Sequence, residues 1–201
     1  MNSHGSRIVR CFGILFAAAA TVVLAQSNPS ATDRSSASTS DKNASSMKAK
    51  GGSDQAFVQE AAVGGMAEVE MGRLAVQKAK DDRVRQFGQK MIDDHSKAND
   101  QLKQAASQEG LSVPSAIDEK HKATMARLEK LSGAQFDSAY AKEMVRDHKE
   151  DVKLFEKQSA AGSSAVQKFA AETLPTLKNH LQMAEALGSG GSSTGSAGSD
   201  H

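Results

Sequence analysis

The residues of this chain best suited to chemistry are four histidines and two glutamates on predicted helix faces that are otherwise apolar. Imidazole nitrogens and carboxylate oxygens are together suitable ligands for zinc, iron, manganese and copper. Helical bundles build metal sites from inward side chains on facing helices. The candidate metal ligands are Glu68, Glu70, His95, His121, His148 and His180.

Each candidate also has a structural interpretation, which the sequence leaves open. An inward histidine is often a core residue that bonds to a helix carbonyl or to a carboxylate, and Asp94 and Asp147 are available for that. Glu68 and Glu70 could equally be paired with a neighbouring arginine, lysine or histidine, because burying an unpaired carboxylate is costly.

Two of the histidines end a short sequence motif that occurs twice. Met91-Ile-Asp-Asp-His95 and Met144-Val-Arg-Asp-His148 are 53 residues apart, and Phe87 and Tyr140 precede the two methionines by the same distance. A repeat at this spacing predicts a helix pair used twice, which is a bundle built from two similar helical hairpins.

The elements that must position these residues are predicted to be helices throughout. Apolar residues recur with helical periodicity from Asp54 to Leu187, without the alternation typical of strands. We therefore predict an all-α fold of four long helices and one short connecting helix. The predicted helices run from Asp54 to about Ala79, from Asp81 or Asp82 to Glu109, from Pro114 to Ser132, from Gln135 to Ala161, and from Ser164 to Leu187.

Four local signals refine this prediction. Ser115-x-x-Asp118 and Ser164-x-x-Gln167 are expected to cap the third and fifth helices. Gly64 and Gly65 lie side by side in the first helix, where each costs about 1 kcal/mol relative to alanine. We expect another helix backbone to pack closely there in compensation, with a kink in the first helix as the alternative. Pro175 is expected to kink the last helix.

The N-terminus is predicted to be an export signal. Residues 1–25 combine a basic start at Arg7 and Arg10 with an apolar stretch and a small-residue cleavage site ending at Ala25. We therefore expect the protein to reach the periplasm or cell envelope. Cys11, the single cysteine of the chain, would be removed with this peptide, which excludes thiol chemistry and cysteine-bound metals in the mature protein.

The remainder divides into one domain and two flexible ends. Residues 26–53 are predicted to be a disordered Ser/Ala-rich linker, 54–187 the helical domain, and 188–201 a disordered Gly/Ser tail. Without Arg7 and Arg10, 23 basic residues remain against 24 acidic ones, and no basic block carries interleaved aromatics. Nucleic-acid binding is therefore not supported. No mature segment is apolar for long enough to span a membrane as a helix.

Four segments resemble an exported bacterial family known only as a domain of unknown function (number four-one-four-two). They are Ala62-Val-Gly-Gly-Met-Ala-Glu-Val-Glu-Met-Gly-Arg-Leu-Ala75, Met91-Ile-Asp-Asp-His-Ser-Lys-Ala-Asn99, Met144-Val-Arg-Asp-His148 and Thr173-Leu-Pro-Thr-Leu-Lys-Asn-His-Leu181. The resemblance implies a ferritin-like helical bundle. Members of the family are often labelled as candidate outer membrane proteins, and the resemblance implies no activity.

The chain departs from the ferritin-like di-iron pattern of Glu-x-x-His motifs. Ile92, Val145 and Leu177 occupy the position three residues before His95, His148 and His180, and Asp118-x-x-His121 alone approximates the motif. The sequence therefore favours a histidine-rich single-metal site, or no metal, over an oxygen-activating di-iron centre.

Two functions are compatible with the sequence. The first is an exported bundle that binds or buffers iron, zinc, manganese or copper. The second is a non-catalytic interaction or stress-related module of the cell envelope, with an exposed apolar patch for an envelope protein or the membrane surface. No thiol nucleophile, phosphate-binding glycine loop or Ser-His-Asp arrangement supports an enzyme. The oligomeric state is left open.

Overall fold

The computed structural model describes residues 38–189, with side chains from residue 53 onward. Within this part of the chain every regular element is a helix, which confirms the all-α prediction. The helices are α1 (Ser38–Lys78), α2 (Asp82–Gln108), α3 (Glu119–Glu129), α4 (Gly133–Ser159) and α5 (Ala165–Ser189). The predicted signal peptide and almost all of the predicted tail lie outside the described residues, as does the first part of the linker.

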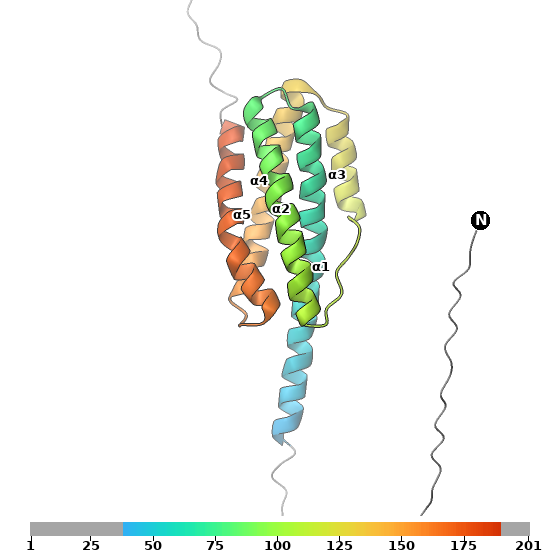
Figure 1. Cartoon of the computed structure of the whole chain (residues 1–201), viewed down its shortest axis with the longest axis vertical. Coiled ribbons are helices and arrows are strands. Elements are labelled where there is room, and N and C mark those ends of the chain that lie inside the picture. Colours follow the sequence, from blue (N-terminus) through green and yellow to red (C-terminus); the bar gives the residue numbers. More distant parts are fainter. Residues whose placement is uncertain (1–37, 190–201) are drawn as a thin grey trace, which may run out of the picture. The chain divides into compact units, whose positions relative to one another are not determined.

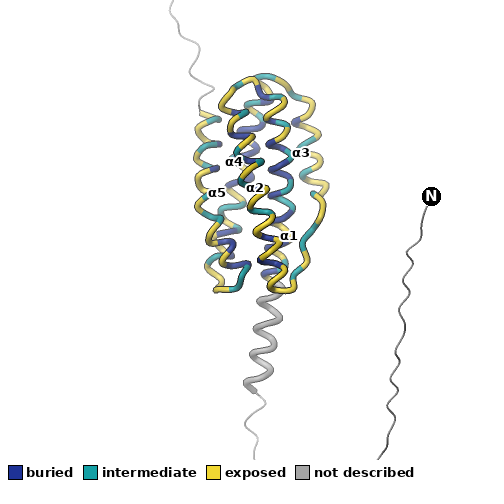
Figure 2. The backbone as a smooth tube through the Cα atoms, in the orientation of Figure 1, coloured by how far each residue is buried: buried dark blue, intermediate teal, exposed yellow. Residues whose placement is uncertain are grey.

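Four long helices run side by side and form the bundle (Figure 1). α4 packs along α5, α2 packs against α5, and the short α3 lies on the outside, against α4. Buried residues line the inward sides of the long helices, whereas their outer sides are exposed (Figure 2). The predicted ferritin-like bundle of four long helices and one short helix is confirmed.

Most helix ends follow from local sequence signals. The Asp81 carboxylate accepts the Arg83 backbone N–H at 2.8 Å and caps α2. The capping box of α5 forms as predicted. The Ser164 N–H donates to the Gln167 side chain at 2.9 Å, and the Gln167 N–H donates to the Ser164 hydroxyl at 3.3 Å.

Two predicted helix starts are wrong. α3 begins at Glu119 rather than near Pro114, because Asp118 is itself the N-cap and accepts the His121 N–H at 2.9 Å. α1 begins at Ser38 rather than Asp54. Extending an existing helix adds one hydrogen bond for each residue fixed, so a packed helix can continue into a segment that has no apolar face.

A close approach of two helix backbones occurs elsewhere than predicted. A Cβ on Gly72 of α1 would stand 2.7 Å from the Gly88 carbonyl oxygen of α2, so these two helices cross almost backbone to backbone. At Gly65 the Asn99 side chain fills the space, and at Gly64 an added Cβ would make only an ordinary contact. The expectation of a helix backbone packed against Gly64 and Gly65 is therefore wrong.

α5 continues through Pro175. In Figure 1 its axis changes direction near the middle of the helix, as expected for a proline that removes one backbone hydrogen bond. Over the described residues no helix is both long and apolar enough to cross a membrane.

The core consists of two apolar clusters, one toward each end of the bundle. Phe57, Phe155 and Phe169 centre the first, with the rings of Phe57 and Phe155 4.9 Å apart and edge to face. Phe87 and Tyr140 belong to the second. Burying each such side chain contributes about 1.5–3 kcal/mol. On every long helix, residues of one cluster give way to residues of the other. On α2, α4 and α5 the change occurs at a histidine, and on α1 it occurs between Ala62 and Ala67, just before Glu68.

Candidate metal centre

The polar side chains between the two apolar clusters come one from each long helix. Glu68 lies on α1, His95 on α2, His148 on α4 and His180 on α5, and each is 5% exposed or less. In sequence each histidine stands between members of the two clusters, and Glu68 follows directly after the first α1 member of the second cluster, Ala67. These side chains form a buried polar layer of three imidazoles and one carboxylate, separate from the buried polar contacts of Asp54 with Gln158 and Gln167.

Each histidine ring has one nitrogen engaged by an oxygen that can only accept a hydrogen bond. His95 Nδ1 lies 2.9 Å from Glu68 Oε2, and His180 Nε2 lies 2.8 Å from Asp94 Oδ2. His148 Nδ1 lies 3.0 Å from the Met144 carbonyl oxygen and 3.3 Å from Glu68 Oε1. The proton of each neutral ring is therefore on the engaged nitrogen, which leaves a lone pair on the other.

The nitrogens left without a proton are His95 Nε2, His148 Nε2 and His180 Nδ1. His148 Nε2 and His180 Nδ1 stand 3.3 Å apart, and one nitrogen from each of the three rings lies within 4.8 Å of the other two. His95 Nε2 is buried and has no hydrogen-bond partner. Lone pairs that face each other at this distance repel unless a cation or a proton lies between them.

The spacing of these nitrogens suits a metal ion. With metal–nitrogen distances of about 2.0–2.1 Å, two ligands of a tetrahedral ion are about 3.3–3.4 Å apart. The separation of His148 Nε2 and His180 Nδ1 has this value. Acceptors that hold the far nitrogen of each ring, as Glu68 and Asp94 do here, are the usual partners of metal-binding histidines.

Most groups of the buried polar layer are in the protonation state that metal binding requires. Burial, with the charge of His95, lowers the pKa of His180 to about 4, and burial also lowers the pKa of His148. Burial acts against the charge of Glu68, yet the neighbouring His95 and His148 lower its pKa to about 2. His95 is the exception, because the Glu68 carboxylate raises its pKa despite burial. At neutral pH, His148 and His180 are therefore neutral and Glu68 is charged.

The structure brings four of the six predicted ligands together and leaves two apart. Glu70 lies on a more exposed face of α1, 3.6 Å from Arg73. His121 lies on α3, where its Nδ1 is 2.6 Å from Asp118 Oδ1. Glu68 is in the layer, but it contacts the Nδ1 atoms of His95 and His148, which are not the nitrogens left without a proton.

Two residues near the layer were not predicted from the sequence. Asn99 and Asp151 line a small cavity beside Glu68 and His95. Burial and the charge of Glu68 raise the pKa of Asp151 well above its usual value. Their spacing held a signal, since Asn99 follows His95 by four residues and Asp151 follows His148 by three, which places them one turn further along the same helix faces.

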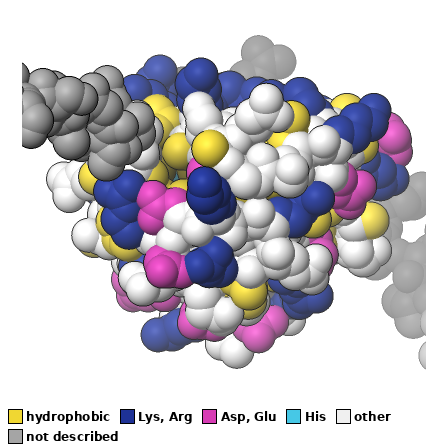
Figure 3. All heavy atoms as spheres, turned by 90° about the horizontal axis from the view of Figure 1, so that it is seen from above, with side chains coloured by type: hydrophobic (Ala, Val, Ile, Leu, Met, Phe, Trp, Pro, Cys, Tyr) yellow, Lys and Arg dark blue, Asp and Glu magenta, His cyan; other side chains and the backbone are white. Residues whose placement is uncertain are grey.

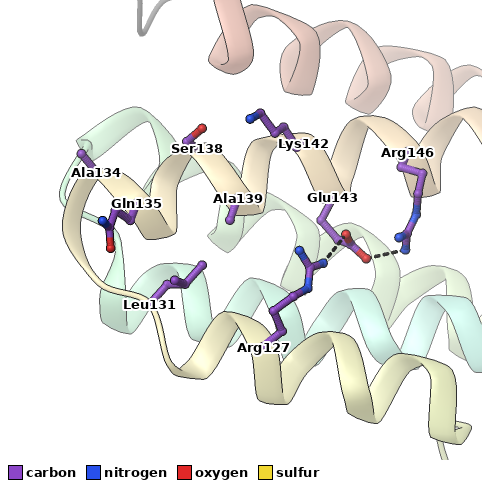
Figure 4. A pocket seen from close by; sticks show the side chains of 9 residues that line it. All are labelled: Arg127, Leu131, Ala134, Gln135, Ser138, Ala139, Lys142, Glu143 and Arg146. Carbon is purple, nitrogen blue, oxygen red and sulfur yellow. Dashed lines mark hydrogen bonds and ion pairs between the residues drawn. The ribbon is translucent and has the colours of Figure 1, made fainter.

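A wide surface cleft lies away from the histidines. It has a volume of about 800 Å³ and lies between α3 and α4 (Figure 4). Inside it the buried Glu143 carboxylate accepts a hydrogen bond from Arg127 at 2.8 Å and another from Arg146. These ion pairs fasten α3 to α4. On the end of the bundle seen in Figure 3, side chains of both charges are interspersed, as on a solvated surface.

Comparison with known proteins places the chain in a family. The sequence profile of the domain of unknown function DUF4142 matches residues 37–187. The chain belongs to this family. The resemblance noted from the sequence is thereby confirmed. No curated protein sequence matches the chain.

Solved structures share the fold of this DUF4142 protein. A candidate secreted DUF305 protein from Streptomyces coelicolor has a TM-score of 0.59 at 18% identity, over 72% of this chain and 96% of that one. A DUF305 fragment from Deinococcus radiodurans has a TM-score of 0.60 at 16% identity, over 68% and 96%. CopM in its Cu(II)-bound form has a TM-score of 0.58 at 15% identity, also over 68% and 96%. At these identities the likeness shows a common fold.

Proposed function

We propose that this bundle binds one transition-metal ion through His95 Nε2, His148 Nε2 and His180 Nδ1. The observation that carries the proposal is the close approach of three buried imidazoles, with His148 Nε2 and His180 Nδ1 3.3 Å apart and His95 Nε2 without a hydrogen-bond partner. Glu68, Asp94 and the Met144 carbonyl hold the three rings in this orientation. In this role Glu68 orients ligands instead of binding the metal itself, which narrows the ligand set expected from the sequence.

Copper and zinc fit this ligand set best. Imidazole suits copper, zinc, iron and nickel, whereas manganese prefers oxygen ligands, and divalent copper binds most strongly of the first-row ions. Copper comes first for a second reason, because CopM, named in its Cu(II)-bound form, has the same fold. With the signal peptide predicted at residues 1–25, the protein would bind or buffer this metal in the periplasm or cell envelope.

The direct experiment is metal titration of the chain beginning at Gln26, prepared without a histidine tag. Elemental mass spectrometry after equilibration with copper or zinc should find one ion per chain. The double variant His95→Gln/His148→Gln should lose it. His121→Gln is the matched control, because it is the same substitution at a histidine outside the cluster, and it should keep the metal. Equal metal content in the double variant and in the control would refute the proposal.

The described surface does not favour the alternative function as an interaction module. That function requires an exposed apolar patch, and among the side chains the structure describes Val76, at 37% exposure, is the one large hydrophobic residue on the surface. A single such residue is ordinary for a soluble surface. The buried polar layer therefore remains the best guide to function.

A further inference from the structure

A small cavity lies beside the histidine cluster, enclosed by all four long helices. Its volume is about 20 Å³. Glu68, His95, Asn99 and Asp151 form its polar walls, and apolar residues such as Leu102 close the rest. A cavity needs about 10–15 Å³ and two to four polar partners to hold a water molecule. This one meets both conditions, and it has room for little more than one small molecule.

Two residues of the cavity wall each carry a buried polar atom without a hydrogen-bond partner, although the glutamate oxygen lies 3.3 Å from His148 Nδ1. These atoms are Glu68 Oε1 and His95 Nε2, and each belongs to a side chain that is almost wholly buried. Buried polar atoms are nearly always hydrogen-bonded, and an unpaired one indicates a water, an ion or a ligand in the functional state. His95 lines the cavity and also belongs to the three-histidine cluster, so it joins the cavity to the proposed metal position.

A glycine that lowers helix stability helps to keep this cavity open. Gly65 lies in the interior of α1, where glycine costs about 1 kcal/mol relative to alanine. A Cβ at this position would collide with the Asn99 amide, so the glycine lets that amide stand at the cavity wall. A surface groove between α2 and α5, about 180 Å³ in volume, shares Ala98 and Thr173 with the cavity lining, which gives solvent a short way in.

We propose that the metal ion held by the three histidines keeps one coordination position open toward this cavity, and that this position takes a water molecule or an inorganic ligand of similar size. The inference rests on the proposed metal site. Closed structural metal sites use four protein ligands, whereas sites that bind or transform small ligands use three and leave the fourth position to water. The bundle is then a small-ligand site and not a sealed store.

The residue nearest to serving as a fourth ligand is engaged elsewhere. Glu68 faces the Nδ1 atoms of His95 and His148, at 2.9 and 3.3 Å, on the opposite edge of each ring from the Nε2 atom that would hold the metal. The Glu68 side chain also lines the cavity. There it is placed to accept a hydrogen bond from the bound water, together with the polar side chains of Asn99 and Asp151.

The test uses the copper-loaded chain and pulsed electron paramagnetic resonance in ordinary and deuterated water. Coupling to imidazole nitrogens reports the metal site, and deep deuterium modulation reports water bound directly to the copper. We expect both signals. Ala61→Val adds bulk to the cavity wall and should lose most of the deuterium modulation while keeping the nitrogen coupling. Ala62→Val, the same change at a core alanine that does not line the cavity, should keep both.

The outcomes separate the two proposals. If no copper binds, or copper binds without imidazole coupling, the proposed function fails. If wild-type copper shows imidazole coupling but no directly bound deuterons, the metal site stands and the open position is refuted. The wild-type result alone decides this, even if Ala61→Val destabilises the bundle. Equal deuterium modulation in both folded variants would mean that the water enters from another side, which also contradicts the inference.

Discussion

Glu68→Gln replaces a buried carboxylate by an amide of nearly the same size, and it should weaken metal binding without removing a ligand. Glu68 fixes the protonated nitrogen of His95 and lies within 3.3 Å of His148 Nδ1. Loss of such an outer partner typically reduces metal affinity about 10–100-fold. Competition with a chelator of known affinity measures this loss. Glu70→Gln is the matched control on the same helix, since Glu70 is half-exposed and pairs with Arg73.

The same substitution should also destabilise the metal-free protein. The pKa of Glu68 is lowered from 4.5 to about 2. One pKa unit corresponds to about 1.4 kcal/mol, so the folded protein favours the charged form by roughly 3 kcal/mol. A neutral amide forgoes most of that. Urea unfolding should therefore show Glu68→Gln to be less stable than wild type by a few kcal/mol and Glu70→Gln to be nearly unchanged. Equal affinities and equal stabilities for the two variants would refute the role assigned to Glu68.

Three further predictions concern the protein without metal. Because the pKa of Glu68 is lowered on folding, its stabilisation is complete above pH 4.5 and is lost as the pH falls toward 2; urea midpoints across this range should drop more for wild type than for Glu68→Gln. Gly88→Ala should lower the free energy of unfolding by about 1–3 kcal/mol, because the added methyl would press on the facing α1 backbone. Gly64→Ala, where the added methyl has room, should raise it by about 0.5–1 kcal/mol. Equal thermal midpoints for the two variants would contradict the close crossing of α1 and α2. Asp54→Ala should lower the free energy of unfolding by about 3 kcal/mol, because this buried carboxylate accepts three hydrogen bonds that tie α1 to α4 and α5. In the same chemical denaturation assay, Asp100→Ala at an exposed position should change the free energy of unfolding by less than about 0.5 kcal/mol.

The fold was predictable because helical periodicity and caps are local signals. The capping box at Ser164 and Gln167 formed as predicted, and the repeated motif lies on two of the four long helices, with His95 on α2 and His148 on α4. The start of α3 was not predictable in the same way. Asp118 can either close a capping box begun by Ser115 or cap a later helix itself, and the difference depends on how the segment before it packs.

The site was predictable to the level of helix faces and no further. Inward positions indicated His95, His148 and His180, which the structure brings together. Glu68 and Glu70 could not be distinguished, because α1 is apolar around much of its circumference and its rotation in the bundle decides which carboxylate is buried. The choice of ring nitrogen was also beyond the sequence. It depends on contacts such as that between His180 and Asp94, which join residues far apart in the chain.

The measurement that tests the proposed metal site most directly is anomalous X-ray diffraction from crystals of the copper- or zinc-loaded protein. We predict one strong peak within about 2.0–2.1 Å of His95 Nε2, His148 Nε2 and His180 Nδ1. Glu68 should lie outside bonding distance, on the far edge of the rings. A peak located at His121 or Glu70 with none at the three-histidine cluster would contradict the proposed site, and so would a loaded protein whose only metal is bound at the surface.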